Sequence, residues 1–361
     1  MNPVIEQYTI TTTPKYNFPQ PAPETLLPQR FIELSINSLR QVRSNAFQYN
    51  PQTMQQETTT PDYPVQMQLK RQPLPLSPRH QETTISAVDT STIKIGETTT
   101  GIIVAIRGAT VHRQNRNYHY TRLGPFIFHL TEENKNAVYN NLERAYFNTP
   151  YSNHQSTPPL MQMPTRLASL LERWLQTNLT KTTSSGIILF DGSLTSGTID
   201  TPTHRMREIL SAARRNNNVV LAFSKATSMR SNGYLITDLL PEGEAPYLLE
   251  TLGLRFKAPT VPLGDVYVAR LQKANMAFRL DIDCEVPVTS RMEAVEKLLG
   301  NDAMQQGYPE TLRLAHILCT FTANEVLAMQ HFITRRHGIQ IVNRPDMHRL
   351  LFGPFGREGY A

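Results

Sequence analysis

Two aspartates follow short apolar runs that are typical of buried β-strands. Asp89 follows the run 85–88, and Asp191 follows the run 186–190. Ligands of α/β sheets bind outside the carboxyl ends of the strands, so both carboxylates stand where a site would form. Taken alone, each aspartate is more simply explained as a turn or cap residue, because Asp-Gly-Ser is a common turn sequence.

A glutamate inside an apolar helical segment adds a third carboxylate. Glu172 interrupts the apolar run 167–175, where it either lies at the edge of an apolar stripe or faces other acids. Asp89, Glu172 and Asp191 together form an all-oxygen ligand set that suits Mg²⁺ or Mn²⁺. Paired divalent ions activate a water and stabilise the leaving oxygen in phosphodiester cleavage. The three acids therefore indicate metal-dependent phosphodiester chemistry.

Three further side chains suit such a site. His316 lies in an apolar helical run, where a histidine is either buried in the core or acts as a proton carrier or metal ligand. Lys225 ends the run 219–224, where its ammonium either contacts a phosphate or is solvated. Tyr308 comes eight residues before His316, next to Pro309 at the predicted start of a helix. Asp281 and Asp283 share one face of a strand and are weaker candidates, since a solvated edge explains them equally well.

The elements that position these residues alternate between strands and helices. The patterns predict strands over 85–89, 101–112, 119–130, 186–194, 218–228, 266–272 and 277–286, and helices over 131–147, 165–178, 204–216, 291–299 and 309–335. Gly124-Pro125 is expected to break the third strand, and Thr131 to cap the first helix. This alternation favours an α/β domain built around a mixed sheet.

The first 80 residues differ in composition, since they contain 12 of the 26 prolines. Residues 1–23 and 50–80 are expected to be extended or poorly ordered. Residues 24–44 predict one amphipathic helix that packs on its own domain or, less favoured, on a partner subunit. The predicted division is an N-terminal region over 1–80, a catalytic domain over 81–335 and a basic tail over 336–361.

Charge and cysteine content exclude several classes of protein. The net charge of +6 and the pI near 9.3 permit a polyanionic partner such as nucleic acid. The two cysteines, Cys284 and Cys319, lack metal-type spacing, which argues against a disulfide framework and a cysteine-based zinc site. No apolar run approaches the ~20 residues that cross a bilayer. A cytoplasmic protein with no membrane partner is therefore expected.

Five motifs, in order along the chain, resemble those of the NurA nuclease family. They are Ala87-Val88-Asp89-Thr90-Ser91, Glu172 on a helix, Leu189-Phe190-Asp191-Gly192-Ser193-Leu194, Phe223-Ser224-Lys225, and Gly307-Tyr308-Pro309 with Leu314-Ala315-His316. The resemblance covers about residues 24–335. Thr90 stands where the family commonly has glycine, and Ala226-Thr227-Ser228 after Lys225 departs from the family's charged residue and serine.

The resemblance implies a ribonuclease-H-like core and an Mn²⁺-dependent DNA nuclease, with Mg²⁺ as an alternative metal. It implies that Asp89, Glu172 and Asp191 bind the metal, that Tyr308 and His316 complete the site with His316 as a further ligand, and that Lys225 lies near the scissile phosphate. It also implies a homodimer that works with a HerA-like hexameric translocase in DNA end resection and double-strand-break repair. Two alternatives stay open: a catalytically weak DNA-binding or scaffold subunit, and a ribonuclease-H-like nuclease acting on RNA or junctions.

Overall fold

The protein is described by a computed structural model over residues 5–9, 26–41, 68–70, 72–147, 158–198, 201–231, 233–241, 244–273, 276–339 and 341. Most of the two segments expected to be extended or poorly ordered, and almost all of the basic tail, lie outside these residues. The described parts of the N-terminal region are strands β1 (Ile5–Thr9), β2 (Gln68–Leu69) and β3 (Leu74–Pro75) and the helix α1 (Leu26–Gln41).

Five strands form the centre of the main sheet. β4 (Ile85–Glu97), β5 (Gly101–Gln114) and β6 (Asn117–Thr131) are antiparallel neighbours, and β7 (Ile187–Asp191) and β9 (Val219–Ser224) continue the sheet parallel to β4. The strand order is β6-β5-β4-β7-β9. Helices α2 (Lys135–Phe147) and α3 (Met163–Thr182) precede β7, and α4 (Thr203–Arg215) connects it to β9. This is the connectivity of the ribonuclease-H-like fold, so the predicted fold class is confirmed.

The sheet extends beyond this centre on both sides. β15 (Phe278–Asp283), β14 (Gly264–Arg270) and β12 (Tyr247–Leu252) follow β9 in antiparallel pairing, and β2 and β3 both pair with β12. At the other edge β1 pairs with β6. The remaining described strands form three two-stranded sheets: β8 (Thr195–Ser196) with β13 (Val261–Pro262), β10 (Arg230–Ser231) with β11 (Tyr234–Leu235), and β16 (Met304–Gln305) with β17 (Tyr308–Pro309). A short 3₁₀ helix, η1 (Leu160–Gln162), directly precedes α3.

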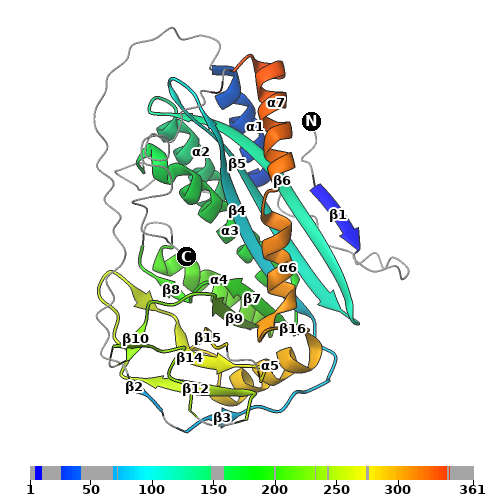
Figure 1. Ribbon diagram of the computed structural model, residues 1–361, viewed down its shortest axis with the longest axis vertical. Helices are drawn as coiled ribbons and strands as arrows, with labels where there is room; N and C mark the ends of the chain where they lie inside the picture. The colour runs from blue at the N-terminus through cyan, green and yellow to red at the C-terminus, as the bar shows by residue number, and fades with distance from the viewer. Residues whose placement is uncertain are drawn as a thin grey trace, which may run out of the picture.

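Helices cover both faces of the central strands. Figure 1 shows α6 (Glu310–Cys319) in front of β4 and β5, and α3 behind them. Because successive strand residues point to opposite faces, Val88 joins the core beneath α3 while Ala87 joins the core beneath α5 (Val288–Asn301) and α6. The sheet is therefore a buried middle layer.

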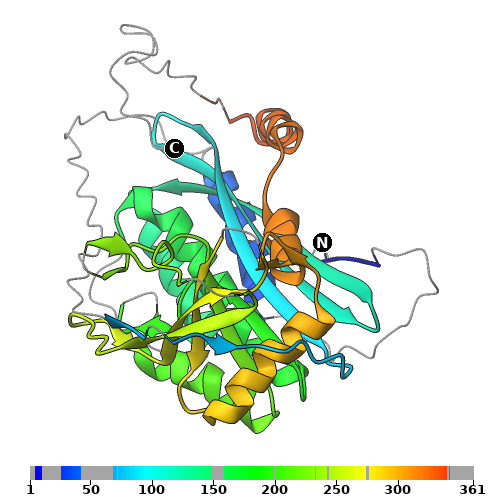
Figure 2. The same ribbon diagram turned by 60° about the horizontal axis from the view of Figure 1, so that its bottom comes forward.

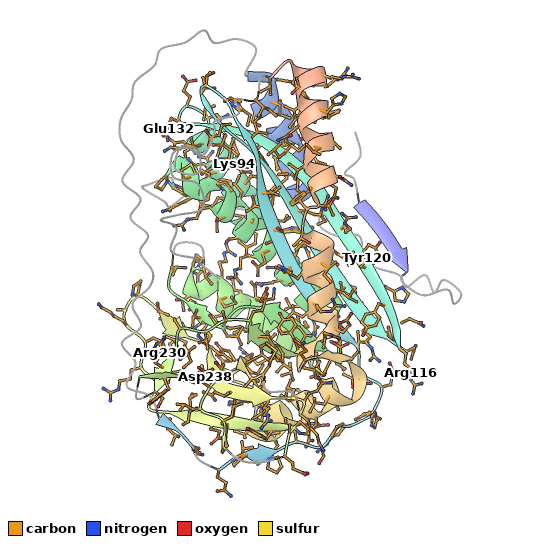
Figure 3. The ribbon with its side chains drawn as sticks, viewed as in Figure 1. Lys94, Arg116, Tyr120, Glu132, Arg230 and Asp238 are labelled. Carbon is orange, nitrogen blue, oxygen red and sulfur yellow. The ribbon has the colours of Figure 1, made fainter. Side chains whose placement is uncertain are left out.

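Two further helices, α1 and α7 (Ala323–His337), pack against the three long strands. α1 packs on β6, where the fully buried Phe31 ring lies 5.1 Å from Phe126 and 5.7 Å from Phe128. α7 adds Met329 and Ile333 to a small core with β4 and β5. Figure 2 shows α7 standing apart from α6 along the chain. Figure 3 marks the two ends of the long strands, with Lys94 and Glu132 toward one and Arg116 at the other.

The predicted break in the third strand is wrong. β6 continues through Gly124-Pro125, and its pairing with β5 shifts register between Ile106 and Gly108. Proline has no N–H to donate to a ladder, so it is accommodated where the pairing is irregular. The strand therefore continues through this irregularity in its pairing.

Two predicted helix boundaries are also wrong. The helix expected over 309–335 is two helices, because Thr322 caps α7 in a capping box with Glu325. Thr131 is the last residue of β6, and α2 begins only at Lys135. Among the described residues, no helix combines the length and apolarity that a bilayer crossing requires.

Candidate active site

Asp89 and Asp191 occupy equivalent positions on neighbouring parallel strands. The pairing of β4 with β7 ends at Val88 and Phe190, and each aspartate is the next residue of its strand. β7 ends at Asp191, whereas β4 continues to Glu97 with β5 as its partner. Asp89 thus lies inside a long strand, and the prediction that it lies at the end of a strand is wrong. The two carboxylates still meet where β7 ends.

His316 reaches Asp89 from α6. The His316 Nδ1 atom lies 2.7 Å from Asp89 Oδ2, and the Thr90 N–H donates to Asp89 Oδ1 at 2.7 Å. Asp89 is 6% exposed, while the His316 side chain is 47% exposed. Burial raises the pKa of Asp89, and the Asp191 charge adds to that rise. A half-exposed imidazole is not a core histidine, so the alternative reading of His316 as a packing residue is wrong.

Asp191 pairs with Lys225 and is followed by a turn that hydrogen bonds hold to β9. Lys225 Nζ donates to Asp191 Oδ2 at 2.6 Å. Gly192 N–H donates to Phe223 O, and Ser224 Oγ donates to Gly192 O, each at 2.8 Å. These bonds tie the turn after β7 to the end of β9, which fixes where the Asp191 carboxylate lies.

Asp281 supports the same turn from the core. Its carboxylate accepts the Leu194 N–H at 3.0 Å and is paired with Arg279 through two bonds of 2.7 and 2.6 Å. Asp281 is 1% exposed, so it is not a residue of a solvated edge. Asp283 is equally buried and pairs with Arg214. The sequence marked both aspartates only as weak candidates, and their role is structural.

Glu172 approaches from α3, on the opposite face of the sheet. Gln176 Nε2 donates to Glu172 Oε1 at 2.9 Å. Burial raises the pKa of Glu172 to about 7, and the charges of Asp89 and Asp191 add to the rise. Asp89 and Asp191 are therefore close enough to affect the ionisation of Glu172.

Tyr308 closes the other side of the site. Its ring packs on Phe278 at 5.3 Å and Phe223 at 6.1 Å between centroids, and Lys225 Nζ lies 5.9 Å from its centroid. Burial, with the charges of Asp191 and Asp89, raises the pKa of Tyr308. Its buried hydroxyl has no hydrogen-bond partner among the described residues. Such a group indicates a position for a water or ligand atom.

The chemical types of the candidate donors suit a divalent cation. Asp89, Glu172 and Asp191 offer carboxylate oxygens and His316 an imidazole nitrogen, which suit Mn²⁺ or Mg²⁺. Burial, together with neighbouring carboxylates, raises the pKa values of Asp89 and Glu172 more than the nearby cations lower them. A bound cation would add positive charge beside these acids. The Tyr308 hydroxyl could donate a hydrogen bond to a water on that cation or to a phosphate.

The tightest set of ligand atoms includes a residue that sequence analysis missed. Asp89, His316 and Cys319 are the one group of three His, Cys, Asp or Glu residues, within the described part of the chain, whose ligand atoms all lie within 4.8 Å of one another. Glu172 and Asp191 lie outside this set. The spacing His316-x-x-Cys319 on one helix was the available signal, but the sequence analysis considered only the spacing between the two cysteines.

Comparisons with known proteins give no sequence match. No protein-family model matches the chain, and no curated protein matches it. The order of strands and the geometry of the site therefore carry the assignment of fold and candidate residues.

Three solved structures are similar to this chain at low identity. The NurA nuclease from Sulfolobus solfataricus has a TM-score of 0.42 and 15% identity, and the alignment covers 73% of this chain and 88% of that one. An endonuclease V from Bacillus subtilis has a TM-score of 0.32 and 13% identity over the same shares. The C-terminal lobe of a budding yeast Argonaute has a TM-score of 0.27 and 11% identity, over 72% of this chain and 51% of that one.

Proposed function

We propose that this protein is a divalent-metal-dependent nuclease that hydrolyses the phosphodiester bonds of DNA, as a member of the NurA family. The observation that carries the proposal is the meeting of Asp89 and Asp191 at the end of β7, with His316 bonded to the first and Lys225 to the second. Paired aspartates with a flanking imidazole and ammonium suit metal-assisted hydrolysis of a phosphate ester.

Each residue has a distinct role in this proposal. Asp89, Glu172, Asp191 and His316 would hold Mn²⁺ or Mg²⁺, and the bound metal supplies an activated water and charge for the leaving oxygen. The Lys225 ammonium, 40% exposed, neutralises the scissile phosphate once substrate competes for it with Asp191. The buried Tyr308 hydroxyl donates to a phosphate oxygen or to an ordered water.

The proposal extends to substrate and partners. The net charge of +6 is compatible with DNA, and the ordered motifs that resemble the NurA family favour endonucleolytic or 5′–3′ exonucleolytic cleavage in DNA end resection and double-strand-break repair. A homodimer and a HerA-like hexameric translocase are the proposed partners. Ile317, Leu327 and Phe332, which are about half exposed or more on α6 and α7, support apolar contact with another subunit.

A scaffold without catalysis is the less favoured alternative. Burial penalises the ionised forms of Asp89 and Glu172, and the neighbouring carboxylates add to that penalty. A purely structural subunit gains nothing from grouping acids in this way, whereas a metal site requires it.

Cleavage assays with isosteric variants test the proposal. We expect the purified protein to degrade DNA with Mn²⁺, less well with Mg²⁺, and not at all with a chelator. Asp89→Asn and Asp191→Asn should each lower the rate by ~100-fold or more while DNA binding survives. Asp238→Asn, an exposed aspartate near β10 and β11 that Figure 3 labels, is the matched control.

The same assay separates the alternatives. Labelled single-stranded DNA, double-stranded DNA and RNA of one sequence are compared in parallel, so that preferential RNA cleavage would favour the other ribonuclease-H-like reading. If both aspartate variants cleave DNA as fast as Asp238→Asn, the assigned site is wrong.

A further inference from the structure

Asp89, His316 and Cys319 bring together an oxygen, a nitrogen and a sulfur donor. Their ligand atoms all lie within 4.8 Å of one another, and His316 Nδ1 is 2.7 Å from Asp89 Oδ2. His316 and Cys319 are three residues apart on α6 and thus share one helix face, which packs on β4. The thiol distinguishes this set from the oxygen-rich donors on the Asp191 side.

We propose that these three residues form a site for a thiophilic divalent cation, Zn²⁺, which competes with the catalytic metal. Zinc takes cysteine, histidine and carboxylate ligands, and commonly combines three of them with a water. Thiolate ligands select zinc over manganese, because Mn²⁺ prefers oxygen donors and binds N/O/S sites more weakly. The Cys319 sulfur thus makes these three ligands selective for Zn²⁺ over the proposed catalytic Mn²⁺.

The geometry needs only small adjustments for a tetrahedral ion. Zinc bonds of ~2.0–2.3 Å put neighbouring ligand atoms roughly 3.5 Å apart. The Asp89–His316 contact of 2.7 Å must therefore open by roughly 0.8 Å, and the sulfur, which lies within 4.8 Å of both partners, must close in by about 1 Å at most. Cys319 Sγ at present donates to His316 O at 3.2 Å, a weak bond that is easily replaced. His316 is half exposed, so an ion from solvent can reach its imidazole first, whereas Asp89 and Cys319 are buried.

Coordination balances both protons and charge. Zn–O, Zn–N and Zn–S bonds form, the S–H bond of Cys319 breaks, and its proton passes to the solvent. His316 stays neutral with its remaining proton on Nε2. One carboxylate and one thiolate then cancel the two charges of the ion, which favours the complex at a buried position.

Zinc occupancy would block cleavage. Asp89 and His316 are shared with the proposed catalytic metal, so one ion excludes the other from these two ligands. This inhibitory consequence rests on the proposed function, whereas the binding of zinc does not.

Cobalt spectroscopy tests the site without any activity. Co²⁺ replaces zinc, and a cobalt–thiolate bond gives a strong charge-transfer absorption in the near ultraviolet. Cys284 is an exposed thiol, so the parent for the test is Cys284→Ser. We expect the band in this parent and its loss in Cys284→Ser/Cys319→Ala, with zinc affinity at least about tenfold weaker by chelator competition.

Folding controls keep this test decisive. Because Cys319 is buried, the circular dichroism and melting temperature of each variant are compared first. If the Cys319 variant does not fold, Cys284→Ser/His316→Ala at the half-exposed position replaces it and should weaken zinc binding in the same way. Absence of the thiolate band in the folded Cys284→Ser parent, or an equal band in a folded Cys319 variant, overturns the site.

Cleavage rates test the competition. The rate with Mn²⁺ is measured with and without micromolar Zn²⁺ for each variant, and only the ratio is compared. We expect zinc to slow the Cys284→Ser parent by about tenfold or more and to have less effect after Cys319→Ala. A cobalt band together with cleavage that is insensitive to zinc overturns the competition. If the folded parent does not cleave DNA with any metal, the proposed nuclease function is overturned. The cobalt spectra then test the zinc site independently.

Discussion

Asp89 and Asp191 are 102 positions apart in the sequence but follow directly on the last paired residues of two parallel strands, Val88 and Phe190. Asp89 is anchored on both sides in a long strand, while Asp191 begins a turn held by Ser224 and Asp281. Unequal strand length therefore creates the site, because β4 continues past the point where β7 leaves the sheet.

Replacing His316 should affect catalysis far more than stability. His316→Gln removes a half-exposed side chain, so the melting temperature should change little. The loss of an imidazole beside Asp89 should lower Mn²⁺-dependent cleavage by ~100-fold or more. Thermal denaturation and initial cleavage rates are measured together, with the exposed His204→Gln as control. A folded variant with full activity would remove His316 from the site and leave the acids.

Replacing Lys225 should weaken transition-state stabilisation. Lys225→Met loses the ammonium near the scissile phosphate, and we expect kcat/KM to fall by ~100-fold, with partial recovery in Lys225→Arg. The ion pair with Asp191 is exposed enough that stability should change by less than ~1 kcal/mol. Lys94→Met is the control, because Lys94 is another exposed lysine in an ion pair, with Glu97 on β4 (Figure 3). Equal losses in both variants would argue for a general charge effect.

Replacing Phe31 should destabilise the whole fold. Its fully buried ring packs on Phe126 and Phe128, so Phe31→Ala should lower the free energy of unfolding by ~3–5 kcal/mol. Phe332→Ala, at a phenylalanine that is 51% exposed, should cost less than ~1 kcal/mol. Urea denaturation of both variants compares the two values. Similar costs would show that α1 does not pack on β6 in solution.

Stability should fall with acid in a window set by buried histidines. His129 is 2% exposed, and burial lowers its pKa to about 4. An unfolded histidine titrates near ~6.5, so between about pH 6.5 and 4 the unfolded chain binds a proton that the folded chain does not. The contribution of His129 to the free energy of unfolding is therefore full above pH ~6.5 and decreases as the pH falls, by up to ~1.4 kcal/mol per pH unit.

A histidine variant isolates this slope. Among the described residues, His112 has a similarly lowered pKa of about 4, caused by burial and then by His119. The pKa of Glu172, which burial raises to about 7, contributes a slope of opposite sign over the same range, so each variant is compared with the parent. His129→Gln should lower the parent's slope by up to ~1.4 kcal/mol per pH unit, whereas the exposed His331→Gln should keep it. Urea denaturation from pH 4.5 to 7 measures both slopes, and an unchanged slope in His129→Gln would contradict the prediction.

Local patterns in the sequence were enough to predict the kind and order of strands β4, β5, β6, β7 and β9 and of the helices between them. The apolar runs before Asp89 and Asp191 were recognisable as strand segments because burial on both faces favours continuous apolar sequence. The helix containing Glu172 follows from apolar residues at helical spacing. Such signals are local, so they also indicated an α/β fold with a mixed sheet.

Only the tertiary structure decided which chemical groups meet. The length of β4 depends on its pairing with β5, so Asp89 lies in the interior of a strand and not at the predicted strand end. The exposure of His316 depends on how α6 crosses β4, and the same crossing brings Cys319, 230 positions from Asp89 in the sequence, to the site. Periodicity determines which face of an element is apolar, but contact between distant residues depends on strand register and helix packing, which no local pattern encodes.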